Sequence, residues 1–262
     1  MPEMPDTPPP DTITRPDGGT IAYHRTPGKS PGVVFLTGFR SDMEGTKALA
    51  LEAFCRARGQ AFLRFDYFGH GQSSGDFIDG TIGRWADDAL FALDELTDGP
   101  QVLVGSSMGG WIMLLAARAR AERIAGLLGL AAAPDFTEDL IPYELSAEQK
   151  AEINKNGLVK VPNCYDPDDP YLITKALLDD GKDHLLLRAP ISFSGPVRLI
   201  QGILDEDVPW ETALRIQEHL TSEDVEITFV KNGTHRLSEP HDLDRMTTAL
   251  DGLLKSIEQG ED

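Results

Sequence analysis

The chain is poor in cysteine and has no long apolar run. Its 262 residues include only two cysteines, Cys55 and Cys164, and these form no Cys-x-x-Cys pair. So few cysteines exclude a disulfide framework, and their spacing argues against a zinc–thiolate site. The longest apolar stretch, residues 124–134, is far shorter than the roughly 20 residues that a membrane-spanning helix requires. We therefore expect no membrane span and no metal site.

Basic residues are also scarce. Lysine and arginine number 24 against 43 acidic residues, which gives a formal net charge of −19. A surface of this sign disfavours nucleic acids and anionic membranes as partners. The first residues, 1–11, are rich in proline and acid where a signal peptide has a basic patch and an apolar run. We expect a disordered leader over residues 1–11 and a soluble, cytoplasmic protein.

Short apolar runs recur along the chain and lack the strict alternation of a half-solvated sheet. Such runs are typical of strands that are buried on both faces. Segments with helical period separate them, and strand alternating with helix predicts a mostly parallel sheet with helices on both faces. The expected strands are 33–37, 61–65, 102–104, 124–131, 197–201 and 225–230, and the expected helices are 46–58, 85–96, 110–121, 210–220 and 243–257.

The two ends of this pattern differ from its middle. At the front, residues 12–15 and 20–25 flank the turn signal Asp17-Gly18-Gly19, which predicts an antiparallel N-terminal edge. Between Pro134 and Pro190 the strand signal disappears, and only two helix candidates remain, at 146–156 and 170–180.

We interpret residues 134–190 as a helical lid inserted into an α/β core formed by residues 12–133 and 191–262. Insertions at the carboxyl ends of strands lie over the ligand crevice of such sheets, which favours a lid. A crossover segment without a function of its own is the alternative.

The strongest chemical signal is the pentapeptide Gly105-Ser106-Ser107-Met108-Gly109. It lies between an expected strand and an apolar helix, which is the context of a nucleophile elbow. Gly105 and Gly109 let the chain pass close to itself, so that the hydroxyl of Ser107 is held above the sheet at a helix N-terminus. This pattern predicts that Ser107 is a nucleophile; a flexible turn of small residues is the alternative.

A serine nucleophile needs a base, and the base needs an orienting acid; in this architecture the order is serine, acid, histidine. Asp205 follows the expected strand 197–201, 98 residues after Ser107. We predict Asp205 as the acid. Glu206 and Asp207 remain alternatives, although either is also suited to cap the helix that follows.

The predicted base is His235. It lies on a glycine-containing loop after the last expected strand, 30 residues beyond Asp205. The other histidines fall before the nucleophile, in the insertion or on a helix, except for His241, which remains a rival at the start of the last helix.

The same chemistry requires donors to the oxyanion of a tetrahedral intermediate. One is expected to be the backbone N–H of Met108, directly after the nucleophile. The other is expected to be the N–H of Phe39 on the loop after an early strand, where Gly38 lets the chain turn back over Ser107. We also assign Gly38 and Arg40 to the substrate pocket.

These residues together resemble the α/β-hydrolase superfamily. The likeness is carried by the motifs at residues 37–39, 66–73, 105–109 and 202–209, and by His235. It implies an α/β-hydrolase fold and places Ser107 and Asp205, with His235, at the positions of a catalytic triad.

Within the superfamily, a closer likeness extends from about residue 30 to residue 257. It resembles the family of mitochondrial palmitoyl-protein thioesterases and mycophenolic acid acyl-glucuronide esterases, with its bacterial relatives. The segments that carry this likeness are 38–43, 47–52, 64–67, 98–101, 104–111 and 208–210. The resemblance implies a small thioester or an S-acylated protein as substrate.

We therefore expect a serine hydrolase that cleaves carboxylic esters or thioesters through an acyl-enzyme, with no metal or organic cofactor. One alternative is a general carboxylesterase for small esters or acyl-glucuronides, in which Arg40, Lys155 or Arg188 would steer a carboxylated substrate. Another is a non-catalytic ligand-binding protein with the hydrolase fold. The sequence leaves monomer and dimer equally open.

Overall fold

A twisted sheet forms the centre of the molecule. The structure is a computed structural model that describes residues 9–162 and 170–260. Within these residues an eight-stranded sheet has the order β1-β2-β4-β3-β5-β6-β9-β10. Its strands are β1 (Asp11–Thr14), β2 (Thr20–Thr26), β3 (Lys29–Leu36), β4 (Gln60–Phe65), β5 (Gln101–Ser106), β6 (Ile124–Leu130), β9 (Val197–Gly202) and β10 (Val225–Val230).

The predicted direction of the strands is confirmed. From β4 to β10 all neighbours in the sheet are parallel, whereas β1 pairs with β2, and β2 with β4, in the antiparallel sense. Along β3, Val33 and Phe35 face one apolar cluster while Val34 and Leu36 face the other. A strand buried in this way on both faces has no polar alternation, which is why its sequence reads as a continuous apolar run.

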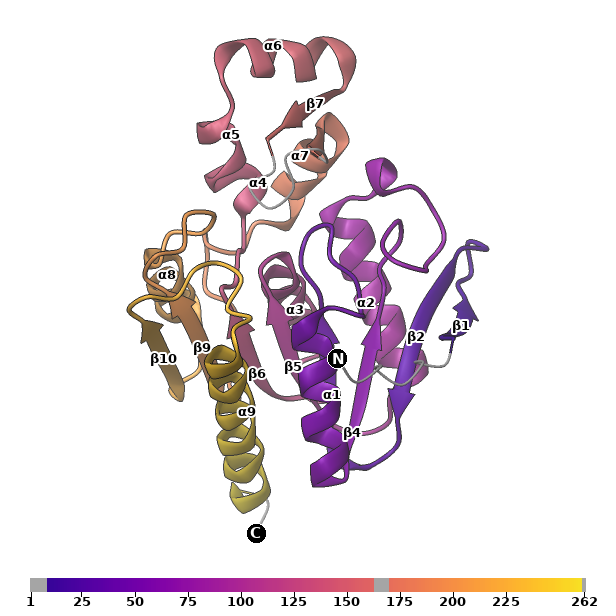
Figure 1. The fold of residues 1–262 in the computed structure, drawn as a ribbon, viewed down its shortest axis with the longest axis vertical. Helices are drawn as coiled ribbons and strands as arrows, with labels where there is room; N and C mark the ends of the chain where they lie inside the picture. Colours follow the sequence, from indigo (N-terminus) through magenta and orange to yellow (C-terminus); the bar gives the residue numbers. More distant parts are fainter. Residues whose placement is uncertain (1–8, 163–169, 261–262) are drawn as a thin grey trace, which may run out of the picture.

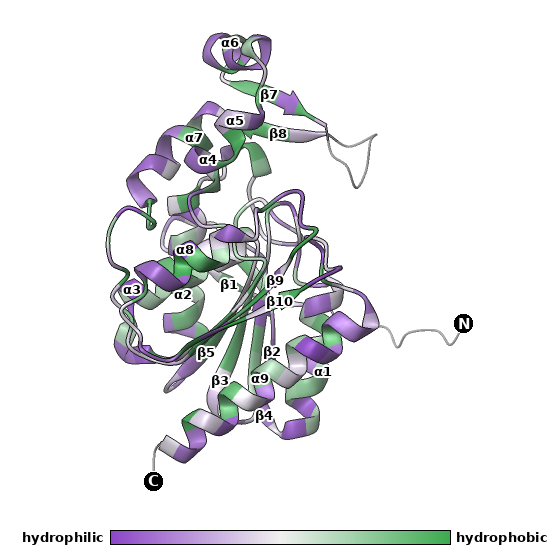
Figure 2. Cartoon of the chain, turned by 90° about the vertical axis from the view of Figure 1, so that its left-hand side faces the viewer, coloured by the Kyte–Doolittle hydropathy of each residue, from purple (hydrophilic) through white to green (hydrophobic). Residues whose placement is uncertain are grey.

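Helices cover both faces of the sheet, as predicted (Figures 1 and 2). On one face lie α1 (Thr46–Arg58) and α9 (Pro240–Gly260), and on the other lie α2 (Ile82–Leu96), α3 (Met108–Ala119) and α8 (Glu211–His219). The helix α9 buries Met246, Leu250, Leu253 and Leu254, a spacing that puts one apolar stripe against the sheet. None of the described helices is long and apolar enough to cross a membrane.

The N-terminal leader differs from the expectation at its end. Residues 1–8 lie outside the described residues. Asp11, expected to be disordered, begins β1 instead and is paired with Tyr23. The strand therefore begins one residue earlier than expected, because the register of the hairpin pairs Asp11 with Tyr23 although Asp11 itself is not apolar.

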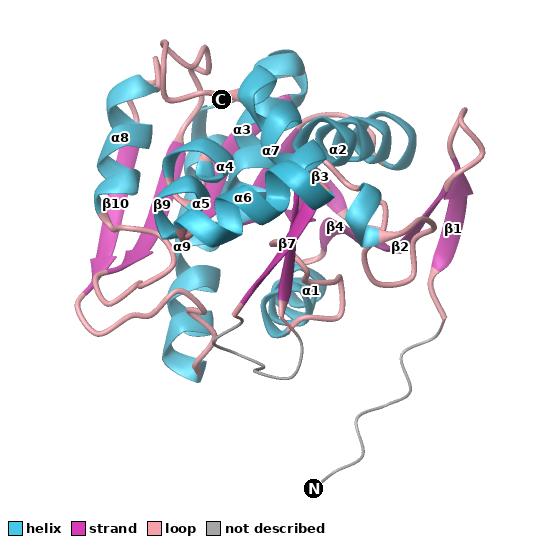
Figure 3. Ribbon diagram, turned by 90° about the horizontal axis from the view of Figure 1, so that it is seen from above, coloured by secondary structure: helices cyan, strands magenta, loops and turns pink. Residues whose placement is uncertain are grey.

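The described residues between 134 and 190, named the insertion from here on, lie above the carboxyl ends of the parallel strands (Figures 1 and 3). They contain α4 (Phe136–Asp139), α5 (Ile141–Glu144), α6 (Ala147–Asn156), β7 (Leu158–Val161), β8 (Tyr171–Thr174) and α7 (Lys175–Gly181). A small apolar cluster of Leu145, Ile153, Val159 and Ile173 joins these elements.

The insertion is less helical than predicted. Tyr171–Thr174, expected to begin a helix at residue 170, pairs with β7 in an antiparallel two-stranded sheet. The helix α7 starts only at Lys175, because the Thr174 side chain accepts a hydrogen bond from the Leu177 N–H and so caps it. Strands of four residues are too short for their period to be recognised in the sequence.

Candidate active site

The loop between β5 and α3 holds Ser107 in an unusual backbone conformation. Its φ of 54° and ψ of −120° lie in a region that L-residues rarely adopt. A Cβ on Gly105 would lie 2.4 Å from the Gly109 carbonyl oxygen, and one on Gly109 would lie 2.0 Å from the carbonyl oxygen of Leu36. Both glycines are therefore required by close backbone approach, and Ser107 stands at the N-terminus of the buried helix α3.

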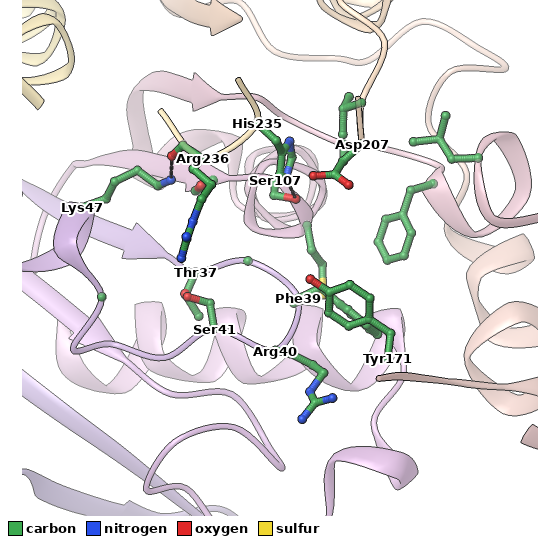
Figure 4. A pocket seen from close by; sticks show the side chains of 18 of the residues that line it. Thr37, Phe39, Arg40, Ser41, Lys47, Ser107, Tyr171, Asp207, His235 and Arg236 are labelled. Atoms are coloured by element: carbon green, nitrogen blue, oxygen red, sulfur yellow. Dashed lines mark hydrogen bonds between the residues drawn. The ribbon is translucent and has the colours of Figure 1, made fainter. Parts of the chain in front are cut away.

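Ser107 is the first member of a chain of hydrogen bonds. Its Oγ lies 2.9 Å from Nε2 of His235, and the Nδ1 atom of His235 lies 2.9 Å from Oδ2 of Asp205. The three residues follow β5, β10 and β9, so the parallel sheet brings together side chains that are 128 and 30 residues apart. Figure 4 shows Ser107 and His235 side by side in the pocket.

The carboxylate of Asp205 is fully buried and saturated with donors. Oδ1 accepts the backbone N–H groups of Asp207 and Val208, at 3.0 and 2.8 Å, and Oδ2 accepts Nε2 of Gln201 at 2.9 Å in addition to the imidazole. These donors hold the carboxylate in one orientation. The imidazole of His235 therefore carries its proton on Nδ1 and presents Nε2 to the serine.

The alternative acids and base are placed differently. The backbone N–H of Asp207 donates a hydrogen bond to the carboxylate of Asp205. The side chain of Asp207 lines the pocket, on the far side of Ser107 from Lys47 (Figure 4). The side chain of His241 is 69% exposed and lies 3.6 Å from Asp242.

The expected oxyanion donors lie beside the serine. Met108 is the first residue of α3, so its N–H has no acceptor in a preceding helical turn. Gly38 passes so close that a Cβ on it would lie 3.4 Å from the Cβ of Ser107. The neighbouring Phe39 anchors this loop by packing its ring against Phe77, Trp85, Phe136 and Tyr171.

A cavity of about 520 Å³ opens over Ser107, between the core and the insertion. This volume is in the range of about 300–1,000 Å³ that is typical of small-molecule sites. One side, named the apolar wall, consists mainly of residues from the insertion: Phe39, Phe136, Leu140, Ile141, Leu145, Val161, Tyr171 and Ile173. The opposite side, named the polar wall, consists of Thr37, Ser41, Asp42, Lys47, Arg236 and Ser238.

Two charged groups in this cavity have shifted pKa values. Burial, and next the positive charge of Arg236, lower the pKa of Lys47 to about 8, although Asp242 and Asp205 partly oppose the shift. Burial raises the pKa of Glu144 on α5, and the negative charge of Asp207 raises it further.

Of the three basic residues considered for substrate recognition, Arg40 lines the pocket and Arg188 and Lys155 do not. Arg40 lines the pocket together with Gly38, and its guanidinium donates to the Pro170 carbonyl at 2.9 Å. The guanidinium of Arg188 contacts Asp135 and Asp139 outside the pocket lining. Lys155 is exposed on α6 and is not part of the lining.

Sequence reasoning missed Gln201, Lys47 and Arg236. Gln201 is the last-but-one residue of β9 and reads as part of a strand, so its contact with Asp205 has no signal in the sequence. Arg236 directly follows His235, and this adjacency is the one clue that could have pointed to it.

Three possible metal ligands also meet at this site. Ligand atoms of Asp205, Asp207 and His235 lie within 4.8 Å of one another. The imidazole also contacts both Asp205 and Ser107, so His235 and Asp205 belong to the hydrogen-bonded chain as well.

Comparison with known proteins agrees with this geometry. Residues 33–249 match the model of a family described as "Alpha/beta hydrolase family". The bovine protein named mitochondrial palmitoyl-protein thioesterase ABHD10 is 40% identical over 245 residues, which are 94% of this chain and 80% of the relative.

Two solved structures are similar over almost their whole length. A putative hydrolase from Agrobacterium vitis has a TM-score of 0.89 and 40% identity, and the match covers 93% of this chain and 98% of the other. Alpha/beta hydrolase domain-containing protein 10 from mouse has a TM-score of 0.88 and 38% identity, with 95% and 99% covered.

The expected cytoplasmic location is wrong. Five curated relatives, at 39–40% identity, are all named as mitochondrial proteins, which contradicts it. The expectation was based on the low cysteine content, which argues against an oxidising environment, and on the short apolar runs, which argue against a membrane span. Neither property distinguishes one aqueous compartment of the cell from another.

Proposed function

Because the chain belongs to the alpha/beta hydrolase family, we propose that it is a serine hydrolase that cleaves thioesters and carboxylic esters through an acyl-enzyme. The observation that carries the proposal is the unbroken hydrogen-bonded chain from Ser107 through His235 to Asp205. A serine hydroxyl is a weak nucleophile on its own, and this arrangement supplies the base that activates it.

In the first step the Oγ of Ser107 attacks the carbonyl carbon of the substrate, and Nε2 of His235 takes the hydroxyl proton. Negative charge develops on the carbonyl oxygen, where the N–H groups of Phe39 and Met108 are available as donors. One such donor contributes about 3 kcal/mol to the stability of a transition state of this kind.

The intermediate then collapses to the acyl-enzyme. His235 returns its proton to the departing thiol or alcohol, and afterwards takes a proton from the water that attacks the acyl-enzyme. The second collapse releases the carboxylic acid and restores Ser107. Throughout, the buried carboxylate of Asp205 stabilises the imidazolium and keeps its ring oriented.

The apolar wall supports an acyl chain as the part of the substrate that lies under the insertion. Each methylene that leaves water for such a surface contributes roughly 0.8 kcal/mol, so a longer chain gains affinity as long as the wall continues. The relatives' name, palmitoyl-protein thioesterase, supports a thioester with a long acyl chain, including an S-acylated protein, as the substrate class.

The test is the hydrolysis of S-palmitoyl and S-octanoyl peptides and of their oxygen-ester counterparts. We expect Ser107→Ala to lower kcat/KM by about 10³-fold or more. The control is Ser256→Ala, because Ser256 lies on α9 outside the pocket lining, where its hydroxyl donates to the Leu253 carbonyl of the same helix. If Ser107→Ala kept the wild-type rate, the mechanism would be wrong.

The same panel separates the alternatives. If the protein hydrolyses short oxygen esters fast and long-chain thioesters not at all, it is a general carboxylesterase and not a thioesterase. A folded protein that hydrolyses none of the substrates, and whose Ser107 is not labelled by a fluorophosphonate, would instead be a binding protein.

A further inference from the structure

The loop with the expected oxyanion donor Phe39 contains a residue in an unusual conformation. Residues 38–41 form a tight turn, which is closed by a hydrogen bond of 3.1 Å from the Ser41 N–H to the Gly38 carbonyl. The third residue of this turn is Arg40, with a φ of 54°. Turns with a positive φ at that position normally have glycine or asparagine there. An arginine has a backbone cost that glycine would not have, which indicates a function for its side chain.

The side chain of Arg40 joins the turn to the insertion. Its guanidinium donates to the carbonyl of Pro170 at 2.9 Å, and Pro170 directly precedes β8. The same guanidinium lies over the ring of Phe77, with Cζ 5.6 Å from the ring centroid. Figure 4 shows that it points away from Ser107. Arg40 is thus directed at the hairpin of β7 and β8 and not at the reacting atoms.

Phe39 contacts the same group of residues. Its ring centroid lies 4.9 Å from that of Phe77 and 6.0 Å from that of Tyr171, the first residue of β8. Both central residues of the turn, Phe39 and Arg40, are therefore held by Phe77 and by the start of β8. The hydrogen bond that closes the turn comes from Ser41, so the direction of the Phe39 N–H depends on how the whole turn is held.

This direction matters for the proposed chemistry. A hydrogen bond weakens steeply when the donor is misaligned, and an oxyanion donor is effective because it does not have to reorient during the reaction. A turn with an unfavourable φ at Arg40 relaxes toward another conformation when its side chain is released. Even a small rotation of the turn would then change the direction of the Phe39 N–H.

We propose that Arg40 is a positioning residue, which fastens the oxyanion turn to the insertion and so holds the Phe39 N–H toward the reacting carbonyl. The proposal rests on the proposed function and adds a role for the insertion. Besides forming the apolar wall, the insertion supports the oxyanion hole through the hairpin of β7 and β8. This role replaces the steering of a carboxylated substrate as the function of Arg40.

The test variant is Arg40→Asn, because asparagine accepts a positive φ and is too short to reach the Pro170 carbonyl. The side chain of Arg40 is exposed, so the replacement leaves the core intact. With an S-octanoyl peptide we expect kcat to fall about five-fold, roughly the effect of one hydrogen bond, and KM to stay within about two-fold of the wild type. A donor misplaced only for the oxyanion weakens binding of the transition state and not of the substrate.

An inhibitor separates positioning from a general loss of structure. Heptyl trifluoromethyl ketone has the chain length of the octanoyl group. The Oγ of Ser107 adds to its carbonyl carbon, His235 takes the hydroxyl proton, and the carbonyl oxygen becomes an oxyanion. In Arg40→Asn its Ki should rise by the factor by which kcat/KM falls. The Ki of the corresponding alcohol, which cannot form an oxyanion, should stay unchanged.

Two further variants complete the experiment. Arg40→Lys keeps a cation over Phe77 and a donor for the Pro170 carbonyl, and should restore kcat to within about two-fold of the wild type. The matched control is Arg215→Ala, because Arg215 on α8 also donates to the insertion, to Asp139 at 2.8 Å, but lies outside the pocket lining. The control should keep the wild-type kcat and Ki.

The other outcomes count against the inference. If KM rises in Arg40→Asn while kcat is unchanged, Arg40 contacts the substrate instead of positioning the turn. Unchanged kinetics, or an equal fall of kcat in Arg215→Ala, would also contradict the inference, and in each of these cases the proposed function stands. If the wild-type protein cleaves none of the substrates, the proposed function itself is wrong, and this inference with it.

Discussion

At the scale of single residues, hydrogen bonds distinguish between three acids that stand next to each other in the chain. Asp205, Glu206 and Asp207 each carry a carboxylate and all lie on the loop after β9, so by sequence each is suited to be the acid that orients His235. The structure separates them because the backbone turns immediately after Asp205 and directs two N–H groups at its carboxylate. Order along the chain was therefore sufficient to predict an acid here, whereas the donor from Gln201 depends on a side-chain direction that sequence does not reveal.

His70 is a residue whose burial has a consequence for stability. Its ring packs among Tyr67, Phe77 and Trp85, and Nδ1 contacts the Phe68 carbonyl at 3.1 Å. Nε2 is buried and has no hydrogen-bond partner in the described part of the chain. Burial lowers the pKa of His70 to about 4 from its ordinary value of 6.5, and the charge of Arg40 adds to the shift.

This shift predicts a loss of stability in mild acid. The unfolded chain binds a proton at His70 near pH 6.5 and the folded protein only near pH 4, so the contribution is complete above pH 6.5 and is lost as the pH falls toward 4. Between pH 7 and pH 5 the loss is about 2 kcal/mol. We expect His70→Phe to remove this part of the pH dependence, measured as the free energy of unfolding in urea at both pH values.

Phenylalanine is a suitable replacement because it keeps a ring among the aromatic neighbours, and because the Phe68 carbonyl retains a donor in Nε1 of Trp85, at 3.0 Å. His241→Gln is the control, since that side chain is exposed and should leave the pH profile as in the wild type. An equal loss of stability in His70→Phe and wild type would show that His70 does not titrate in this way.

At the scale of secondary structure elements, prediction succeeded for elements that were long enough to show their hydrophobic period. The helix α1 was expected at residues 46–58, and this is where it lies, because thirteen residues show their period and Gly59 ends the helix with a left-handed φ of 69°. For β8 the sequence predicts a helix instead, because a strand of four residues shows no period. Its pairing with β7 across residues 162–170 is a non-local contact, which local sequence patterns do not record.

The two ends of the insertion are joined by one side chain. Asp135, between β6 and α4, has a φ of 61° and a fully buried carboxylate. That carboxylate accepts the backbone N–H groups of Leu186 and Leu187, both at 2.8 Å, and contacts Arg188 at 3.3 Å. The entry and the exit of the insertion are thus fixed to each other above the sheet.

Removal of this carboxylate should destabilise the protein. Asp135→Gly keeps a residue that accepts a positive φ, so the effect isolates the lost hydrogen bonds. Two buried N–H groups then lack an acceptor, at a cost of about 2 to 4 kcal/mol in the free energy of unfolding. Urea denaturation followed by circular dichroism measures this change.

The control lies in the same insertion. Asp179 on α7 is 48% exposed and pairs with Lys175 and Lys182 at the surface, so Asp179→Ala should change the free energy of unfolding by no more than about 0.5 kcal/mol. If Asp135→Gly were as mild as Asp179→Ala, the ends of the insertion would be held together by other contacts.

At the scale of the whole molecule, the fold followed from the alternation of buried strands and amphipathic helices, and the candidate site followed from three loops at one edge of the sheet. Residue order could predict both because parallel strands bring their carboxyl ends together. The shape and charge of the cavity could not be predicted in this way. They depend on which side chains of α1, the insertion and the loop after β10 converge over Ser107.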